Sequence, residues 1–63
     1  MRITLKSARV NANLTQKQLA DVLNVSTKTI ISWENGFTMP KIDKVEALCN
    51  ALKVSYDDIQ WQI

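Results

Sequence analysis

The sequence of 63 residues contains no histidine and only one each of cysteine (Cys49), glycine and proline. A single cysteine cannot form an intramolecular disulfide, and a chain without histidine has neither a Ser–His–Asp triad nor a zinc site of the usual Cys and His ligands. No apolar run approaches the ~20 residues that cross a bilayer, and no signal peptide is recognisable. We therefore expect no catalytic residue, metal or cofactor, no membrane partner, and a cytoplasmic protein.

The scarcity of glycine and proline leaves few helix-breaking positions, and hydrophobic residues make up 46% of the chain. This composition predicts one small, mostly helical domain over residues 1–63. Charge is unevenly distributed along it. Residues 1–41 hold six basic and two acidic side chains, a balance of +4, whereas residues 42–63 hold two basic and four acidic ones, a balance of −2. A basic N-terminal portion is typical of a surface that binds a polyanion.

Local signals mark the first three of five short helices. A first helix is expected over residues 5–12. The capping box Thr15-Gln16-Lys17-Gln18 starts a second helix over residues 16–23, and Asn24 ends it in a left-handed conformation. Ser26 caps a third helix, which Asn35-Gly36 closes with glycine in the left-handed position.

The second half of the chain predicts two more helices and an unusual tail. Ile42, Val45, Leu48, Cys49 and Leu52 form the apolar stripe of a fourth helix, and the weaker capping box Ser55-Tyr56-Asp57-Asp58 opens a short fifth one. Both chain ends alternate with period two, with Met1, Ile3 and Leu5 on one edge and Ile59, Trp61 and Ile63 on the other. Either these ends pair within one subunit, or the tail packs against a second subunit; a disordered tail is the third alternative.

The second and third helices, joined by Asn24-Val25-Ser26, form a helix-turn-helix over residues 16–35. With Ile30 and Trp33 on the buried side, the outer face of the third helix presents polar residues and is nearly free of acidic groups. Such a face can enter a DNA major groove without repelling phosphate. Its residues are Thr27, Lys28, Thr29, Ile31, Ser32 and Asn35.

An ordered set of segments resembles the helix-turn-helix of Cro and the lambdoid phage repressors, the xenobiotic response element (XRE) family. The resemblance spans about residues 5–59 and implies an all-α, compact five-helix bundle of the lambda-repressor type, with its second and third helices as the helix-turn-helix. It also implies a sequence-specific transcription regulator, a phage- or prophage-type repressor that binds a palindromic operator in double-stranded DNA as a homodimer. The segments are Thr15-Gln16-Lys17-Gln18-Leu19-Ala20, Val25-Ser26, Ile30-Ile31-Ser32-Trp33-Glu34-Asn35-Gly36, Pro40 and Ala51-Leu52-Lys53-Val54-Ser55.

The resemblance also implies roles for individual residues, with a recognition helix over residues 27–35. Arg9 and Glu34 match a partly buried salt bridge of the family. Lys53 replaces the usual glycine after the fourth helix, and Lys41 replaces a capping serine or aspartate. We expect base contacts from Thr27, Lys28, Thr29 and Ser32, and DNA-backbone contacts from Gln16, Lys17, Ser26, Asn35 and Lys41.

Two of these positions leave alternatives open. Lys28 suits guanine O6 and N7 but also suits a phosphate, and Ile31 is either a contact to a thymine methyl group or an ordinary exposed hydrophobic residue. For the whole chain, the alternative function is a protein-interaction module that retains the fold without DNA binding, which the modest net charge of +2 and the apolar tail favour. Neither an enzyme nor a small-molecule ligand is expected, because no acid–base or nucleophile constellation and no effector domain is present.

Overall fold

The computed structural model describes residues 2–61 of the chain. Three of the four α-helices in this part begin at a residue with a hydroxyl side chain, which caps the helix. Before the second α-helix, Thr15 Oγ1 accepts a hydrogen bond from the Gln18 N–H at 3.0 Å, and the Thr15 N–H donates to Gln18 Oε1 at 2.8 Å. Such caps satisfy N–H groups that have no partner within the first helical turn. The elements in chain order are β1 (Ile3–Thr4), α1 (Leu5–Asn11), α2 (Gln16–Leu23), α3 (Thr27–Glu34), α4 (Ile42–Leu52), the 3-10 turn η1 (Tyr56–Asp58) and β2 (Ile59–Gln60).

A left-handed residue follows each of the four α-helices, and two of them, Asn24 and Gly36, are predicted by the sequence; Asn13, just beyond α1, has a φ of 61°. Asn24 after α2 has a φ of 58°, and Gly36, just beyond α3, has a φ of 77°. Lys53 follows α4 with a φ of 57°, so a lysine occupies a conformation that costs a residue with a Cβ roughly 1–2 kcal/mol. Lys41 provides no side-chain hydrogen bond at the start of α4. Both ends of α4 therefore lack the residue that would stabilise them best.

The predicted fifth helix is wrong in extent, because the chain forms only the 3-10 turn η1 before it becomes extended. The two chain ends pair instead within one subunit as parallel strands, with Ile3 opposite Ile59 and Thr4 opposite Gln60. This pairing gives hydrogen-bond partners to backbone groups that a frayed end would leave to water. It is the first of the alternatives raised by the alternating sequence. Met1 and Ile63, which belong to that pattern, lie outside the described residues.

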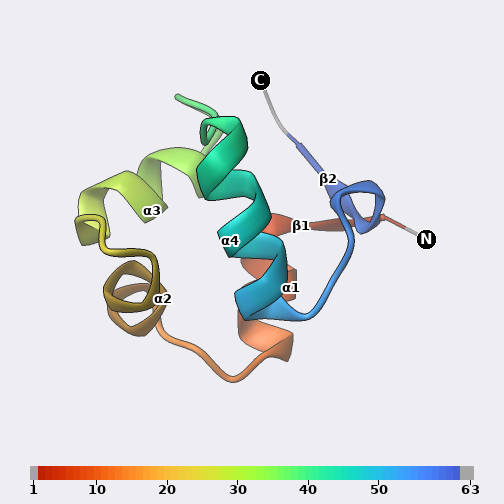
Figure 1. Cartoon of the computed structure of the whole chain (residues 1–63), viewed down its shortest axis with the longest axis horizontal. Coiled ribbons are helices and arrows are strands. Elements are labelled where there is room, and N and C mark those ends of the chain that lie inside the picture. The colour runs from red at the N-terminus through yellow and green to blue at the C-terminus, as the bar shows by residue number, and fades with distance from the viewer. Residues whose placement is uncertain (1, 62–63) are drawn as a thin grey trace.

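Figure 1 shows α2 and α3 on one side of the molecule and the paired strands with η1 on the other, with α1 and α4 between them. The core lies where these elements meet, and Leu19, Ile30, Leu48 and Ile59 are its largest fully buried side chains. Ile42, predicted to belong to the inner stripe of α4, is 80% exposed, because the first residue of the helix lies beyond the edge of the core. No helix of the described residues is long and apolar enough to cross a membrane.

Candidate nucleic-acid interface

The turn between α2 and α3 is held by backbone and side-chain hydrogen bonds. The Val25 N–H donates to the Ala20 carbonyl at 3.0 Å, a bond that closes the left-handed end of α2. Ser26 Oγ then accepts from the Thr29 N–H at 3.2 Å and caps α3. From α4, Lys44 Nζ donates to the Leu23 carbonyl at 2.9 Å and so places a positive charge at the C-terminus of α2, where the helix dipole favours it. This last contact is not evident from the sequence, because it joins residues that are 21 positions apart.

The outer face of α3 carries the residues predicted to contact bases. Ile30 and Trp33 are buried beneath it, as predicted, whereas Lys28 and Ile31 are exposed. Thr27, Thr29 and Ser32 are half-buried, and Asn35 at the C-cap of α3 is exposed. Four of the predicted residues line one open groove of about 450 Å³ together with Phe37 and Thr38; they are Lys28, Thr29, Ile31 and Ser32.

Two hydroxyl groups on this face have partners within the protein. Thr29 Oγ1 lies 3.0 Å from Ser26 Oγ, and Ser32 Oγ lies 2.8 Å from Thr38 Oγ1. A hydroxyl donates one hydrogen bond and accepts two, so both groups keep capacity for a DNA base or phosphate. The internal bonds restrict where these hydroxyls lie, which reduces the entropy lost when they bind a ligand.

The residues predicted to contact the DNA backbone lie in different environments. Lys41 is exposed before α4. Lys17 Nζ lies 3.4 Å from Asp21 Oδ2, with both side chains mostly exposed. Gln16 is half-buried, and its Nε2 donates to Glu34 Oε1 at 3.0 Å, so its amide has a structural partner that the sequence does not indicate. The sequence hides this bond because Gln16 and Glu34 are 18 positions apart.

A nearly buried ion pair joins α1 to the end of α3. Arg9 Nε donates to Glu34 Oε2 at 2.6 Å, and the two side chains are 10% and 4% exposed. Arg9 Nη1 also donates to the Leu14 carbonyl at 2.7 Å. Together with Gln16, these contacts satisfy both carboxylate oxygens of Glu34 with donors. The one acidic residue of α3 is thus directed inward and paired with a positive charge.

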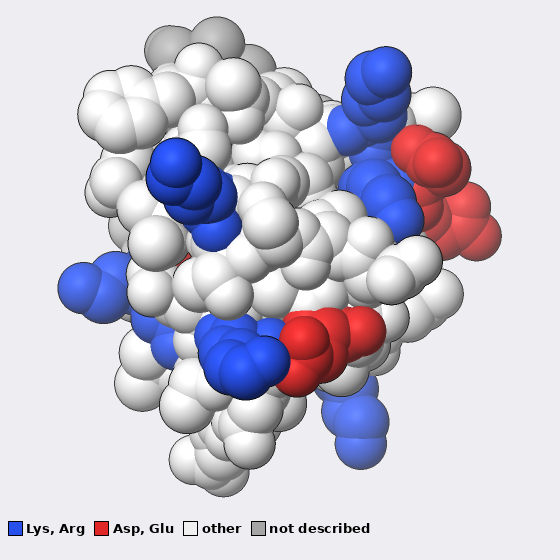
Figure 2. All heavy atoms as spheres, turned by 90° about the vertical axis from the view of Figure 1, so that its left-hand side faces the viewer, with Lys and Arg blue, Asp and Glu red and all other residues white. Residues whose placement is uncertain are grey.

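Figure 2 views the side of the molecule on which α2 and α3 lie, and most of the surface seen there is uncharged. Separate basic side chains stand out on it, one of them beside an acidic group in the lower middle of the view, and further acidic side chains lie at the right-hand edge. A surface of this kind attracts phosphate without a continuous basic patch. Hydrogen bonds and shape then carry more of the recognition than charge does.

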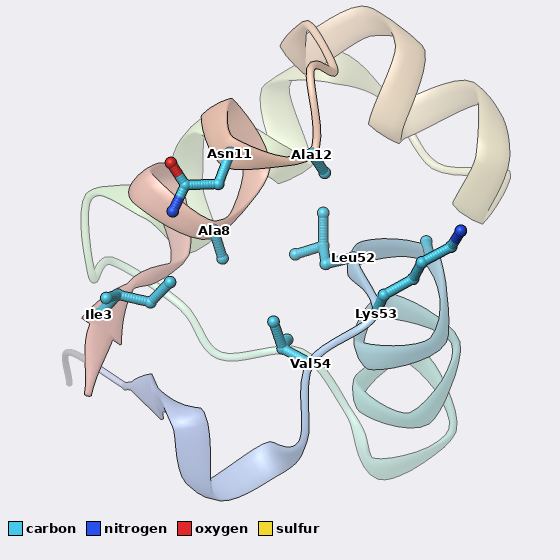
Figure 3. Close-up of a pocket in the computed structure, with 8 residues that line it drawn as sticks. Ile3, Ala8, Asn11, Ala12, Leu52, Lys53 and Val54 are labelled. Carbon is cyan, nitrogen blue, oxygen red and sulfur yellow. The ribbon is translucent and has the colours of Figure 1, made fainter. Parts of the chain in front are cut away.

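A separate hollow of about 360 Å³ lies between α1 and the end of α4 (Figure 3). The side chains of Ala8, Leu52 and Val54 converge on it, and Asn11 and Lys53 stand at its margin. The residues predicted to contact DNA do not include any that line this hollow. It is therefore distinct from the surface formed by α3.

The helix-turn-helix family HTH_3 matches residues 5–59, from the start of α1 to the first residue of β2. The chain belongs to this family. Its match confirms the resemblance to XRE- and Cro-type helix-turn-helix proteins and implies DNA binding as the general role of the domain. The family is also typically non-catalytic.

Three curated relatives match most of this chain. The HTH-type transcriptional activator BcrR of Enterococcus faecalis is 34% identical over 55 residues, covering 87% of this chain and 27% of the relative. The antitoxin PezA of Streptococcus pneumoniae is 31% identical over 55 residues, covering 87% and 35%. The type II methyltransferase M1.ScrFI of Lactococcus lactis subsp. cremoris is 41% identical over 49 residues, covering 73% and 13%.

The chain thus spans about a third or less of the length of each of these relatives. Their names describe a transcriptional activator, a methyltransferase and an antitoxin, and none is a phage repressor. No solved structure matches the chain.

Proposed function

We propose that this HTH_3 domain reads a specific double-stranded operator sequence for a transcription regulator, with α3 as the recognition helix. The observation that carries the proposal is the outer face of α3, which is polar apart from Ile31 and free of acidic side chains among the described residues. Buried Ile30 and Trp33 hold that face outward, and the Arg9–Glu34 pair holds the end of the helix. A helix presented in this way suits insertion into a major groove.

The proposed contacts divide into base-reading and positioning groups. Lys28 reaches guanine O6 and N7 or a phosphate, and the hydroxyls of the neighbouring threonines and serine bond to base edges. Groups at the first turns of α2 and α3 bond to phosphates, which helix N-termini attract, and Asn35 at the C-cap of α3 and Lys41 before α4 contact the backbone from other helix ends. The base-reading group is Thr27, Lys28, Thr29, Ile31 and Ser32; the positioning group is Gln16, Lys17, Ser26, Asn35 and Lys41.

In the finer form of the proposal, two copies bind a palindromic operator as a homodimer that is weak or absent in free solution. Recognition helices spaced by one DNA turn, ~34 Å, then read two half-sites with doubled contacts. Repression of the phage or prophage type follows if the occupied operator overlaps a promoter. Selection of bound duplexes from a random DNA pool gives the operator and its symmetry together, and a selected site without two-fold symmetry would contradict the dimer.

The division into two groups is tested on single-base variants of the selected operator. Lys28→Ala and Thr27→Ala should change which base is preferred at defined positions, each lost base contact costing about 1–3 kcal/mol. Gln16→Ala should weaken all sequences about equally. Lys6→Ala on α1 is the matched control for charge, since it removes one exposed lysine without touching α3. An unchanged preference profile for Lys28→Ala and Thr27→Ala would remove both residues from direct readout.

A protein-interaction module is the second candidate. It is favoured by Ile31 and Phe37, two exposed hydrophobic residues that line the same groove. Binding to mixed-sequence DNA separates the two candidates. A DNA-binding domain should bind such DNA with an affinity that falls steeply as salt is added, because counterions are released from the duplex. An interaction module should show no such binding.

A further inference from the structure

An exposed aromatic side chain lies three residues beyond the end of the recognition helix α3. Phe37 is 78% exposed, and Ile31 on the outer face of α3 is 38% exposed. Both line the groove of about 450 Å³ that also contains Lys28. Neither side chain is needed to complete the core, which closes beneath α3 with Ile30 and Trp33. This surface therefore combines two apolar groups with one positive charge.

The backbone beneath Phe37 is fixed to α3. The Phe37 N–H donates to the Ser32 carbonyl at 3.0 Å, and the Gly36 N–H donates to the Trp33 carbonyl at 3.3 Å, a pattern that the left-handed Gly36 allows. The bond between the Ser32 and Thr38 hydroxyls, 2.8 Å long, closes the other side of the segment. Phe37 thus projects from a segment attached to the recognition helix, not from a free loop.

The charges around the groove favour a nucleic acid as its occupant. Among the described residues that line it, Lys28 is positive and no side chain is acidic. The nearby carboxylate of Glu34 is buried and paired with Arg9. A major groove offers apolar groups to such a surface at one kind of base only, because thymine carries a 5-methyl group there, and phenylalanine is among the side chains that contact it.

We propose that Phe37, together with Ile31, forms an apolar surface that reads thymine 5-methyl groups next to the base contacted by Lys28. Phe37 is then a determinant of sequence specificity outside the recognition helix. The inference rests on the proposed function and adds to it the chemical class of base that is selected. It also gives Ile31 a definite role.

The test removes single methyl groups from the DNA. An operator selected from a random pool by the full chain is rebuilt with deoxyuridine in place of each thymidine in turn, which deletes the methyl group and keeps the base pairing. Dissociation constants are measured for the unmodified chain and for Phe37→Ala, Ile31→Ala and the control Val10→Ala, which trims an exposed residue of α1. Circular dichroism should show all four folded, because the altered side chains are exposed.

For the unmodified chain and the control, at least one deoxyuridine should weaken binding about fourfold, the fold-change that corresponds to ~0.8 kcal/mol for one methyl-sized group. At that position Phe37→Ala should bind both duplexes equally, and Ile31→Ala should reduce the difference between them. The inference is overturned if no deoxyuridine weakens binding, if the full loss persists in Phe37→Ala, or if the selected site contains no thymine. In each of these cases the proposed function, DNA binding through α3, still stands. Absence of any salt-dependent DNA binding would instead overturn the proposed function.

Discussion

The Arg9–Glu34 ion pair supports a prediction that distinguishes a buried ion pair from an exposed one by the free energy of unfolding. The test uses Arg9→Met, Glu34→Leu and the variant carrying both changes, all of which replace a charged side chain with an apolar one of similar size. Each single change leaves an unpaired charge in a place where the two side chains are only 10% and 4% exposed. The double change leaves no charge there at all.

The expected magnitudes follow from that burial. Removing one partner of a buried pair costs about 3–5 kcal/mol, whereas an exposed pair contributes only ~0–1 kcal/mol. Glu34→Leu additionally deprives the Gln16 amide of its acceptor, and Arg9→Met leaves the Leu14 carbonyl without the Arg9 donor. Replacing both charges by apolar groups is often nearly neutral. Each single variant should therefore be less stable by roughly 3 kcal/mol or more, and the double variant should be more stable than either.

Urea unfolding followed by circular dichroism measures these differences. A domain of this length has a free energy of unfolding of about 3–9 kcal/mol, so a single variant loses a large part of its stability or unfolds outright. The double variant keeps the experiment informative in that case, because its recovery of structure is itself the predicted coupling. Additive losses, with the double variant the least stable of all, would refute the interpretation of the pair as buried and coupled.

Three further experiments, two substitutions and one alkylation, test other features of the fold. Lys53→Gly should stabilise the domain by about 0.5–1 kcal/mol in the same unfolding assay. Glycine removes the left-handed strain of the folded state, and the greater freedom that it gives the unfolded chain offsets only part of this gain. Burial, and secondarily the charge of Asp58, raises the pKa of the Cys49 thiol, so alkylation at neutral pH should be much slower in the native protein than in urea. Hydrogen bonds from Ser55, first from its backbone N–H and then from its side chain, lower the pKa of Asp58 below its usual 3.8 in the folded state. The ionised Asp58 therefore stabilises the fold above pH 3.8, and this stability is lost as the pH falls through the lowered pKa. Asp58→Asn should therefore flatten the fall in stability in acid, and an unchanged acid limb would contradict it.

Helices α2 and α3 could be predicted from the sequence because their ends depend on local chemistry. The capping box of Thr15 and Gln18, the left-handed Asn24 and the cap at Ser26 all act within a few residues of one another. The structure places α2 at Gln16–Leu23, the predicted range. Such signals require no knowledge of how the helices pack.

Features that depend on distant residues were not predictable in the same way. The pairing of Ile3 with Ile59 was only one of several alternatives, since the alternating ends do not reveal their partner. The exposure of Ile42 depends on where the core ends, which the periodicity of α4 does not show. No motif of the sequence marks Phe37, and the one local signal is an aromatic residue directly after the glycine that closes the recognition helix.

The inner and outer faces of α3 are coupled electrostatically as well as sterically. Glu34 is the one acidic residue of the helix, and its position at the end of α3 would set a negative charge beside the DNA-facing surface if it were exposed and unpaired. The contact with Arg9 buries that charge and neutralises it at 2.6 Å. Arg9 thus stabilises the fold and, on the proposed function, also keeps the field at the recognition surface favourable to phosphate. Loss of Arg9 alone should weaken DNA binding at low salt even where the domain remains folded, whereas loss of both charges should leave the field nearly unchanged.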